Sequence, residues 1–263
     1  MSNTLEYTQF GPAVRAFTTR RALGRNRERL AEMLSIEPER VIIPHQTHHD
    51  KTKIISPDVI VMSTADRKDY LEGVDAVITD IPGILIGVST ADCIPVLLYD
   101  EAHKAVAAIH AGWRGTVARI VQKTLRLMSD TYSTVPSNVK AVIGPGISLK
   151  NFEVGDEVYT AFAEEGFPME RISRLYKKWH LDLPLCNKIL LVEAGIKPEN
   201  VYIEQICTYD NNDQFFSARM EQKGKEKCGR NFNAIMINDD NDYNQNQNIT
   251  VAAHRDDDSM GRQ

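Results

Sequence analysis

The chain has 263 residues, of which 42% are hydrophobic and 25% are charged, and its formal net charge is −5. This length and composition fit one compact mixed α/β domain and exclude a largely disordered chain. The negative charge argues against a protein whose main partner is nucleic acid, because a surface that binds phosphates needs a local excess of Lys and Arg.

The N-terminal segment, residues 1–11, lacks a basic stretch followed by an apolar run. We therefore expect neither a secretory signal nor a membrane anchor, and we predict a cytoplasmic protein with no membrane partner. Because the cytoplasm is reducing, the cysteines should be thiols or metal ligands rather than disulfides. These cysteines are Cys93, Cys186, Cys207 and Cys228.

The rest of the chain alternates between short apolar runs and helical patterns. Runs bounded by Gly, Pro or Asp predict buried strands at Val74–Thr79, Ile84–Ser89, Val96–Tyr99, Ala105–His110, Val139–Gly144, Val201–Ile206 and Phe232–Ile237. Helices are expected after a cap at Thr116, near Val154–Glu165 and over Leu183–Ala194. The first helix should bury one apolar face, formed by Val117, Ile120, Val121, Thr124, Leu125 and Met128. This order predicts an α/β (α+β) fold with helices and mixed sheets layered around one core.

The composition changes near residue 238. From there to residue 263 the sequence is rich in Asn, Asp and Gln and contains few apolar residues. Such a segment cannot bury enough apolar surface to offset the entropy of ordering its backbone. We therefore predict a single catalytic domain at residues 1–237 and a polar, mobile tail at residues 238–263.

The third and fourth predicted strands are separated by a polar loop and can pair as a hairpin. If Tyr99 faces Lys104, then Cys93 faces His110 at the open end of the hairpin. Directly opposed residues have Cβ atoms roughly 4.5–5.5 Å apart, which is within reach of one metal ion. Pro95 weakens this register, because proline cannot donate to a ladder and often marks a bulge.

A catalytic zinc site has three protein ligands and an open fourth position for water or substrate. A third ligand can come from the cluster that contains His45, His48 and His49. In an extended chain His45 and His49 share one face and His48 takes the other, so spacing alone leaves the choice among them open. Buried His and Cys residues are also common packing or hydrogen-bonding groups.

Several segments, in chain order, match the signatures of one known family. They are Pro44-His45-Gln46-Thr47-His48, Val88-Ser89-Thr90-Ala91-Asp92-Cys93-Ile94-Pro95-Val96, Ala108-Ile109-His110-Ala111-Gly112-Trp113-Arg114-Gly115, Ile143-Gly144-Pro145-Gly146-Ile147, Cys207-Thr208, Phe215-Phe216-Ser217-Ala218-Arg219 and Gly229-Arg230. On these motifs the chain resembles the YfiH-like family, also called the laccase-domain or polyphenol oxidoreductase family. The matches cover nearly the whole chain outside the tail.

The resemblance implies a layered α/β sandwich similar to that of the cytotoxic necrotizing factor toxins, in which a Cys and a His perform hydrolysis. It also implies zinc ligands at the His of Gln-x-His, the Cys of Asp-Cys-x-Pro and the His of His-Ala-Gly-Trp. In this sequence those positions are His48, Cys93 and His110. The family is implicated in phosphorolysis of adenosine, inosine and methylthioadenosine, and in adenosine deamination. We therefore predict a zinc-dependent enzyme whose substrates are a purine nucleoside and phosphate, with copper as an alternative metal.

Other charged residues near these motifs have two interpretations each. Asp92 is a candidate to orient a ligand or move a proton, and equally a candidate to cap the turn before Cys93. Phosphorolysis needs cationic donors for phosphate. The candidates are Arg20, Arg114 and Arg219, each of which can equally be a structural ion-pair partner.

Three other functions fit the same residues. A metal-free Cys93–His110 dyad would suit an amidohydrolase that removes a wrong amino acid from a peptidoglycan precursor, an activity also tied to this family. Two imidazoles and a thiolate suit copper in a polyphenol oxidase, although the chain's 7 histidines are few for several copper ions. A partner-binding module with a structural metal would require the protein to fill the fourth ligand position.

The chain departs from the family pattern after Thr18-Thr19-Arg20. Relatives usually continue with Gly-Gly-Val-Ser and a longer loop, whereas here Arg21–Gly24 lead almost directly to a helical pattern at Asn26–Leu34. If that loop helps to close the substrate pocket, its absence affects substrate specificity more than metal binding.

Overall fold

The computed structural model describes residues 2–224 and 229–239 of the chain. Cys228 and the predicted tail from residue 240 onward therefore lie outside the described residues. Within the described ranges, the predicted strands and helices occur in the predicted order, together with further elements that the sequence analysis did not name. No helix of the described part is long and apolar enough to cross a membrane.

A six-stranded sheet forms the centre of the fold, with the strand order β13-β9-β7-β8-β5-β4. Its strands are β4 (Thr52–Ile54), β5 (Ala76–Thr79), β7 (Ile94–Asp100), β8 (Ala105–Ala111), β9 (Val139–Ile143) and β13 (Val201–Ile203). Every residue of β5, β7 and β8 is buried. Both faces of these strands are covered, which explains why they read as nearly continuous apolar runs rather than as alternating patterns.

Two further sheets complete the strand structure. The larger one has the order β1-β2-β14-β6-β3, with β1 (Thr4–Glu6), β2 (Val14–Thr19), β3 (Val41–Ile42), β6 (Leu85–Thr90) and β14 (Asn231–Ile237). Because β14 pairs antiparallel with both β2 and β6, the last described strand occupies the middle of this sheet. A small sheet of order β10-β12-β11 contains β10 (Glu153–Val154), β11 (Ser173–Leu175) and β12 (Trp179–Leu181).

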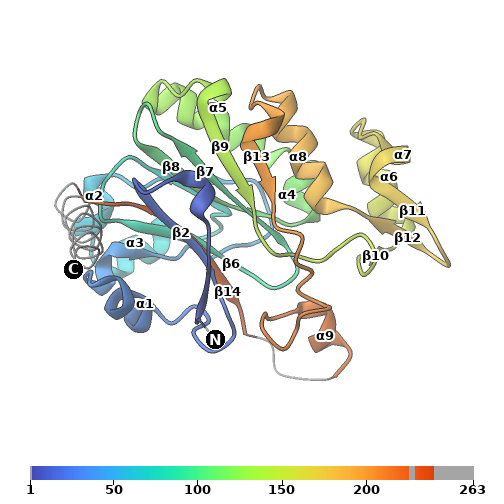
Figure 1. Cartoon of the computed structure of the whole chain (residues 1–263), viewed down its shortest axis with the longest axis horizontal. Helices are drawn as coiled ribbons and strands as arrows, with labels where there is room; N and C mark the ends of the chain where they lie inside the picture. Colours follow the sequence, from blue (N-terminus) through green and yellow to red (C-terminus); the bar gives the residue numbers. More distant parts are fainter. Residues whose placement is uncertain (1, 225–228, 240–263) are drawn as a thin grey trace, which may run out of the picture.

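Helices cover both outer faces of the two large sheets (Figure 1). The helices of the described residues are α1 (Arg27–Leu34), α2 (Pro57–Val61), α3 (Thr64–Tyr70), α4 (Trp113–Val117), α5 (Ile120–Tyr132), α6 (Asp156–Glu164), α7 (Met169–Ile172), α8 (Leu183–Glu193) and α9 (Ala218–Gln222). Short 3₁₀ turns lie at Thr8–Phe10, Pro38–Arg40, Pro136–Asn138 and Pro198–Asn200. As predicted, α8 ends before a left-handed glycine, Gly195, whose φ is 100°.

The core is divided into three layers of buried side chains. Between the two large sheets, Ile86 and Ile235 pack with Leu97 and Ala108. On the outer face of the six-stranded sheet, α5 and α8 bury their apolar residues, and α1 covers the outer face of the five-stranded sheet through Leu30. The predicted layered α/β sandwich is confirmed.

The helix expected to begin at Thr116 is in fact two helices. α4 begins after Gly112, and α5 begins after Arg119, whose backbone is left-handed with a φ of 60°. Thr116 does not cap a helix, because it lies inside α4, where its hydroxyl accepts a hydrogen bond from Asn187 Nδ2 at 3.2 Å. The predicted apolar face of α5 is correct, since Ile120, Val121, Thr124, Leu125 and Met128 are all buried.

The β7–β8 hairpin is present, but its register differs from the predicted one by two residues. Pro95, rather than Cys93, lies opposite His110. β7 continues through Asp100, which pairs with Ala105, and its carboxylate accepts hydrogen bonds from the backbone N–H groups of Ala102 and His103. The connecting turn therefore lies one residue further along the chain than expected. A shift of two residues leaves every side chain on its original face of the sheet. Cys93 therefore still approaches the face that carries His110.

The segment that departs from the family pattern is a short turn. The N–H groups of Leu23 and Gly24 both donate to the Arg20 carbonyl, at 3.1 and 2.9 Å. Helix α1 begins soon after it, because the Asn26 side chain accepts a hydrogen bond from the Arg29 N–H at 2.9 Å. The turn brings Arg25 to the cavity described below.

Candidate metal centre

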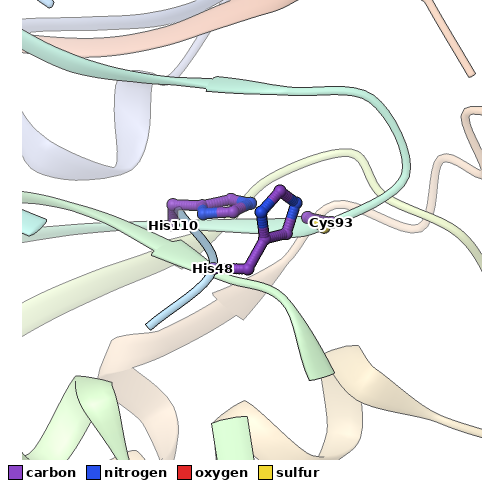
Figure 2. Close-up of side chains that lie close together, drawn as sticks. All are labelled: His48, Cys93 and His110. Atoms are coloured by element: carbon purple, nitrogen blue, oxygen red, sulfur yellow. The ribbon is translucent and has the colours of Figure 1, made fainter. Parts of the chain in front are cut away.

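His48, Cys93 and His110 come together from three separate segments, as Figure 2 shows. Their donor atoms all lie within 4.8 Å of one another, a spacing at which they could hold a metal ion. The two imidazole rings meet edge to face, with centroids 4.8 Å apart. The prediction that Cys93 and His110 share one face, with His48 approaching from elsewhere, is confirmed.

Two chain crossings between the large sheets explain this convergence. His48 lies in the connection from β3 in the five-stranded sheet to β4 in the six-stranded sheet, and Cys93 ends the connection from β6 to β7. His110 lies near the end of β8, on the face that packs against the five-stranded sheet. The three donors therefore meet at one edge of the sandwich, where the chain passes from one sheet to the other.

Asp75 fixes two of the three donors. This fully buried carboxylate accepts a hydrogen bond from His110 Nδ1 at 2.7 Å. It also accepts from the backbone N–H groups of Thr47, His48 and His49, at 3.2, 3.0 and 2.9 Å. Because Nδ1 of His110 is occupied, Nε2 is the nitrogen that faces the other donors.

The charges of the centre favour a metal-binding state of its ligands. Burial alone would raise the pKa of the Asp75 carboxyl, but hydrogen bonds from His110 and the backbone outweigh burial and hold that pKa below its ordinary value. Burial likewise opposes ionisation of Cys93, yet the charge and hydrogen bonds of His110 and His48 lower the pKa of the thiol. A thiolate is the form of cysteine that binds metal.

Local backbone features hold the histidine loop in place. His48 has a left-handed backbone, with a φ of 65°. The Gln46 side chain acts like a strand partner of Ser89, donating to its carbonyl at 2.8 Å and accepting from its N–H at 2.7 Å. A Cβ at Gly112 would lie 3.2 Å from Cys93 Sγ, so the absence of a side chain there leaves room for the donors.

The other two histidines of the cluster do not join the centre. His45 is exposed and its Nδ1 lies 2.7 Å from Glu72 Oε1. His49 is also exposed. The alternation expected for an extended chain does not apply, because the left-handed backbone at His48 interrupts the extended conformation there. The choice of His48, which rested on the family resemblance, agrees with the geometry.

A cavity of about 510 Å³ opens beside the three donors. Its walls include Pro44, Ile147 and Phe152, which are apolar, and Gln46 and Gln222, which are polar. This volume is in the range of small-molecule sites. Among the described residues, the metal-binding group contains no fourth His, Cys, Asp or Glu. The arrangement thus leaves a ligand position that faces the cavity, which argues against a purely structural metal.

Asp92 has partners that differ from the predicted ones. Its backbone is left-handed with a φ of 81°, and its carboxylate accepts hydrogen bonds from Thr208 Oγ1 at 2.6 Å, Ser217 Oγ at 3.0 Å and the Arg219 N–H at 2.7 Å. These contacts tie the segment 208–219 to the turn before Cys93. They favour a structural role for the carboxylate in the cavity wall, and a catalytic role for Asp92 stays a prediction.

The three predicted arginines are in different environments. Arg219 lines the cavity, and its guanidinium donates to the carbonyls of Asn151 and Glu153 at 3.2 and 3.0 Å. Arg20 instead donates to the Gln214 side chain. Arg114 is exposed and lies over the ring of its neighbour Trp113, 4.2 Å from the centroid. Two arginines to which the sequence analysis gave no role, Arg25 and Arg230 of the Gly229-Arg230 motif, line the cavity with Arg219.

The remaining described cysteines have structural environments. Cys207 accepts hydrogen bonds from the Ser148 N–H and Asn151 Nδ2 at 3.4 and 3.2 Å. Cys186 is fully buried in the helical layer, and burial raises the pKa of its thiol. These observations agree with the simple interpretation of both as core thiols.

Sequence reasoning missed Asp75, Gln46, Arg25 and Arg230 as site residues. Asp75 carries a signal in retrospect, because it is a lone carboxylate at the start of a strand that is otherwise apolar. Gln46 belongs to a quoted motif but was given no role. The two arginines lie in a turn and beside a glycine, where composition alone does not distinguish a site residue from a solvated one.

The first prediction concerns Asp75. Asp75→Asn replaces one acceptor oxygen by an NH₂ group that faces N–H donors, so we expect zinc affinity to fall by about 10–100-fold. Zinc binding is measured by competition with a chromophoric chelator. The control is Asp100→Asn, because Asp100 is also fully buried and accepts from His103 Nδ1 at 2.7 Å, but at the far end of the hairpin. Equal zinc affinity in the two variants would contradict the assigned role.

The second prediction separates the histidines of the loop. His48→Ala and His110→Ala should each lose most of the bound zinc, because each removes one of three ligands, while the large core keeps both variants folded. His49→Ala should retain zinc, since only the backbone N–H of His49 takes part in the centre. Metal content is measured by elemental analysis after dialysis. Zinc retained by His48→Ala and lost by His49→Ala would show that the wrong imidazole was chosen.

Comparison with known proteins gives a consistent result. The sequence model of the family described as multi-copper polyphenol oxidoreductase laccase matches residues 4–238. A purine nucleoside phosphorylase from Bacteroides thetaiotaomicron is 46% identical over 216 residues, covering 81% of this chain and 79% of that protein. Adenosine deaminase RL5, from an unknown prokaryotic organism, is 38% identical over 193 residues, covering 72% of this chain and 73% of that protein.

Solved structures have the same architecture. The hypothetical protein YfiH of Bacillus licheniformis superimposes with a TM-score of 0.80 at 26% identity, covering 90% of this chain and 97% of that one. YlmD of Geobacillus stearothermophilus gives a TM-score of 0.79 at 25% identity, with the same coverage of 90% and 97%. With sequence signatures, family match and fold in agreement, the chain belongs to the multi-copper polyphenol oxidoreductase laccase family, the YfiH family of enzymes.

Proposed function

We propose that this chain is a zinc-dependent purine nucleoside enzyme that cleaves adenosine, inosine and methylthioadenosine by phosphorolysis. The observation that carries the proposal is a centre of two imidazoles and one thiolate beside a cavity of about 510 Å³. The relative from Bacteroides thetaiotaomicron named purine nucleoside phosphorylase, 46% identical, supports the reaction. A cytoplasmic location belongs to the same proposal, because a reducing compartment keeps Cys93 available as a ligand.

The residues fit the metal. His48, Cys93 and His110 would hold the ion, and Asp75 keeps His110 in the tautomer that presents Nε2. Bound zinc supplies a Lewis acid beside the cavity, which can polarise a substrate group or acidify water. The apolar wall formed by Ile147 and Phe152 offers a surface for a flat purine ring.

The cationic side of the cavity suits the second substrate, phosphate. Arg219 lines the cavity together with Arg25 and Arg230, and guanidinium groups bind phosphate oxygens in pairs. Asp92 holds the Arg219 backbone at 2.7 Å and thereby positions this wall rather than the chemistry. Phosphate held beside the anomeric carbon would be positioned for attack on it.

Adenosine deamination is a second candidate, favoured by the relative named adenosine deaminase RL5, 38% identical. It needs only water and the polarising centre, without phosphate. The same cavity would accept adenosine in both reactions, so the two activities share His48, Cys93 and His110 and differ in their need for the arginines. Phosphate dependence therefore distinguishes them.

The third prediction concerns the identity of the metal. Purified protein is expected to contain zinc and to be colourless, because zinc is a d¹⁰ ion. Copper in a site of two imidazoles and a thiolate would absorb strongly in the visible. Elemental analysis together with a visible spectrum decides between them. A coloured, copper-containing protein that oxidises phenols would replace the proposal with the activity for which the family is named.

The fourth prediction concerns the reaction. Zinc-loaded protein should convert adenosine to adenine and ribose 1-phosphate only when phosphate is present, because phosphate is the nucleophile that the arginines position. Products are separated by liquid chromatography, with any inosine measured in the same run. Cys93→Ala should lose both products. Base release that is independent of phosphate, or none at all while an amide in a peptidoglycan precursor is cleaved, would contradict the proposal.

A further inference from the structure

A second histidine lies at the cavity, outside the metal centre. His45 is among the residues that line the cavity, and its Nδ1 lies 2.7 Å from Glu72 Oε1. The backbone fixes this pair, because the His45 N–H donates to the Leu71 carbonyl at 3.1 Å and residues 45 and 72 form a parallel bridge. With Nδ1 bound to a carboxylate, Nε2 is the nitrogen left to act on a ligand.

Departure of a purine leaves an electron pair on the base, so the reaction is faster when an acid gives the base a proton. Most titratable groups among the described cavity residues are committed elsewhere. Cys93, His48 and His110 form the metal-binding group, and the Asp92 carboxylate already accepts three hydrogen bonds. His45 is the described cavity residue that combines a titratable ring with a nitrogen free for substrate.

We propose that His45, held by Glu72, is the general acid that protonates the departing purine, an inference that rests on the proposed phosphorolysis. A phosphate oxygen forms a bond to the anomeric carbon while the glycosidic C–N bond breaks and its electron pair stays on the base. Nε2 of His45 gives its proton to N7 of the purine. The proton that phosphate loses returns to His45 through solvent, which the 67% exposure of the His45 side chain permits.

Glu72 has a defined part in this step. Its carboxylate accepts the Nδ1–H bond and so keeps the ring oriented with Nε2 available to substrate. Glu72 itself is not a cavity-lining residue, so it acts through His45 as a positioning residue. Glu72→Gln should therefore reduce turnover less than His45→Gln does, and for the same substrates.

An exposed His–Glu pair is often only a weak surface ion pair, and the chain contains a matched control for that alternative. His103 Nδ1 also lies 2.7 Å from a carboxylate oxygen, Asp100 Oδ2, although this pair is more buried than the His45–Glu72 pair. This second pair lies at the turn between β7 and β8, at the opposite end of the hairpin from His110. His103→Gln removes an equivalent interaction without changing the cavity.

The fifth prediction uses the chemistry of the leaving base. In 7-methylinosine the purine already carries a methyl group at N7, so the base departs as a neutral molecule without needing a proton. Zinc-loaded wild type should cleave both inosine and 7-methylinosine with phosphate. His45→Gln should lower kcat for inosine by about 10²-fold or more, with little change for 7-methylinosine. His103→Gln should match wild type on both substrates, and all variants should hold equal zinc.

Each outcome has a distinct meaning. If wild type releases no base from either nucleoside, the proposed function fails and this inference fails with it. If wild type cleaves inosine but His45→Gln loses the same factor on both nucleosides, or loses nothing on inosine, the general-acid role is overturned while phosphorolysis stands. Cleavage of inosine without cleavage of 7-methylinosine by wild type would also contradict the role, because the preactivated base should leave at least as readily.

Discussion

The site depends on one buried carboxylate. Asp75 accepts four hydrogen bonds, one from the His110 ring and three from consecutive backbone N–H groups of residues 47–49. A single carboxylate thus sets both the orientation of one imidazole and the path of the loop that carries another. A buried carboxylate without hydrogen-bond partners is unstable. The loop N–H groups and the His110 ring each satisfy part of the hydrogen-bonding capacity of the Asp75 carboxylate. Loss of either set of bonds would leave the buried carboxylate with fewer partners, and the bonds to the loop help to hold the left-handed backbone at His48.

The sandwich brings these groups together because the chain passes from one sheet to the other at one edge. The chain crosses between the sheets from β3 to β4 and from β6 to β7, and both crossings carry donors. The second crossing is tied by Asp92 to the segment that leads to α9, which forms another wall of the cavity. Packing in the layers on both sides therefore fixes the site geometry. This position is typical, because ligand sites tend to lie where elements of a rigid scaffold meet.

The sequence predicts the strands of the two large sheets well where both faces are buried, because continuous apolar runs such as β7 and β8 have few alternatives. It predicts the hairpin but not its register, since β7 extends through Asp100 and the Asp100 carboxylate holds the turn one residue further along the chain. Family resemblance selects His48 where spacing does not, because a left-handed residue breaks the alternation. The partners of Asp75 and Gln46 could not be found from local patterns, because the packing of distant segments brings these groups together.

The donor set and the cavity together support an enzyme in which different walls of the cavity bind the substrates and carry the chemistry. In the proposed reaction, the three donors hold the metal, the arginines provide positive charge, and the His45–Glu72 pair provides a proton. These roles require that the metal be bound by the ligands that Asp75 orients.

The most direct measurement is a crystal structure of the zinc-loaded protein with anomalous scattering recorded at the zinc absorption edge. The account predicts one anomalous peak, about 2.0–2.1 Å from a ring nitrogen of His48 and from Nε2 of His110 and about 2.3 Å from Cys93 Sγ. A peak bound to His45 or His49, or one ligated directly by Asp75, would contradict it.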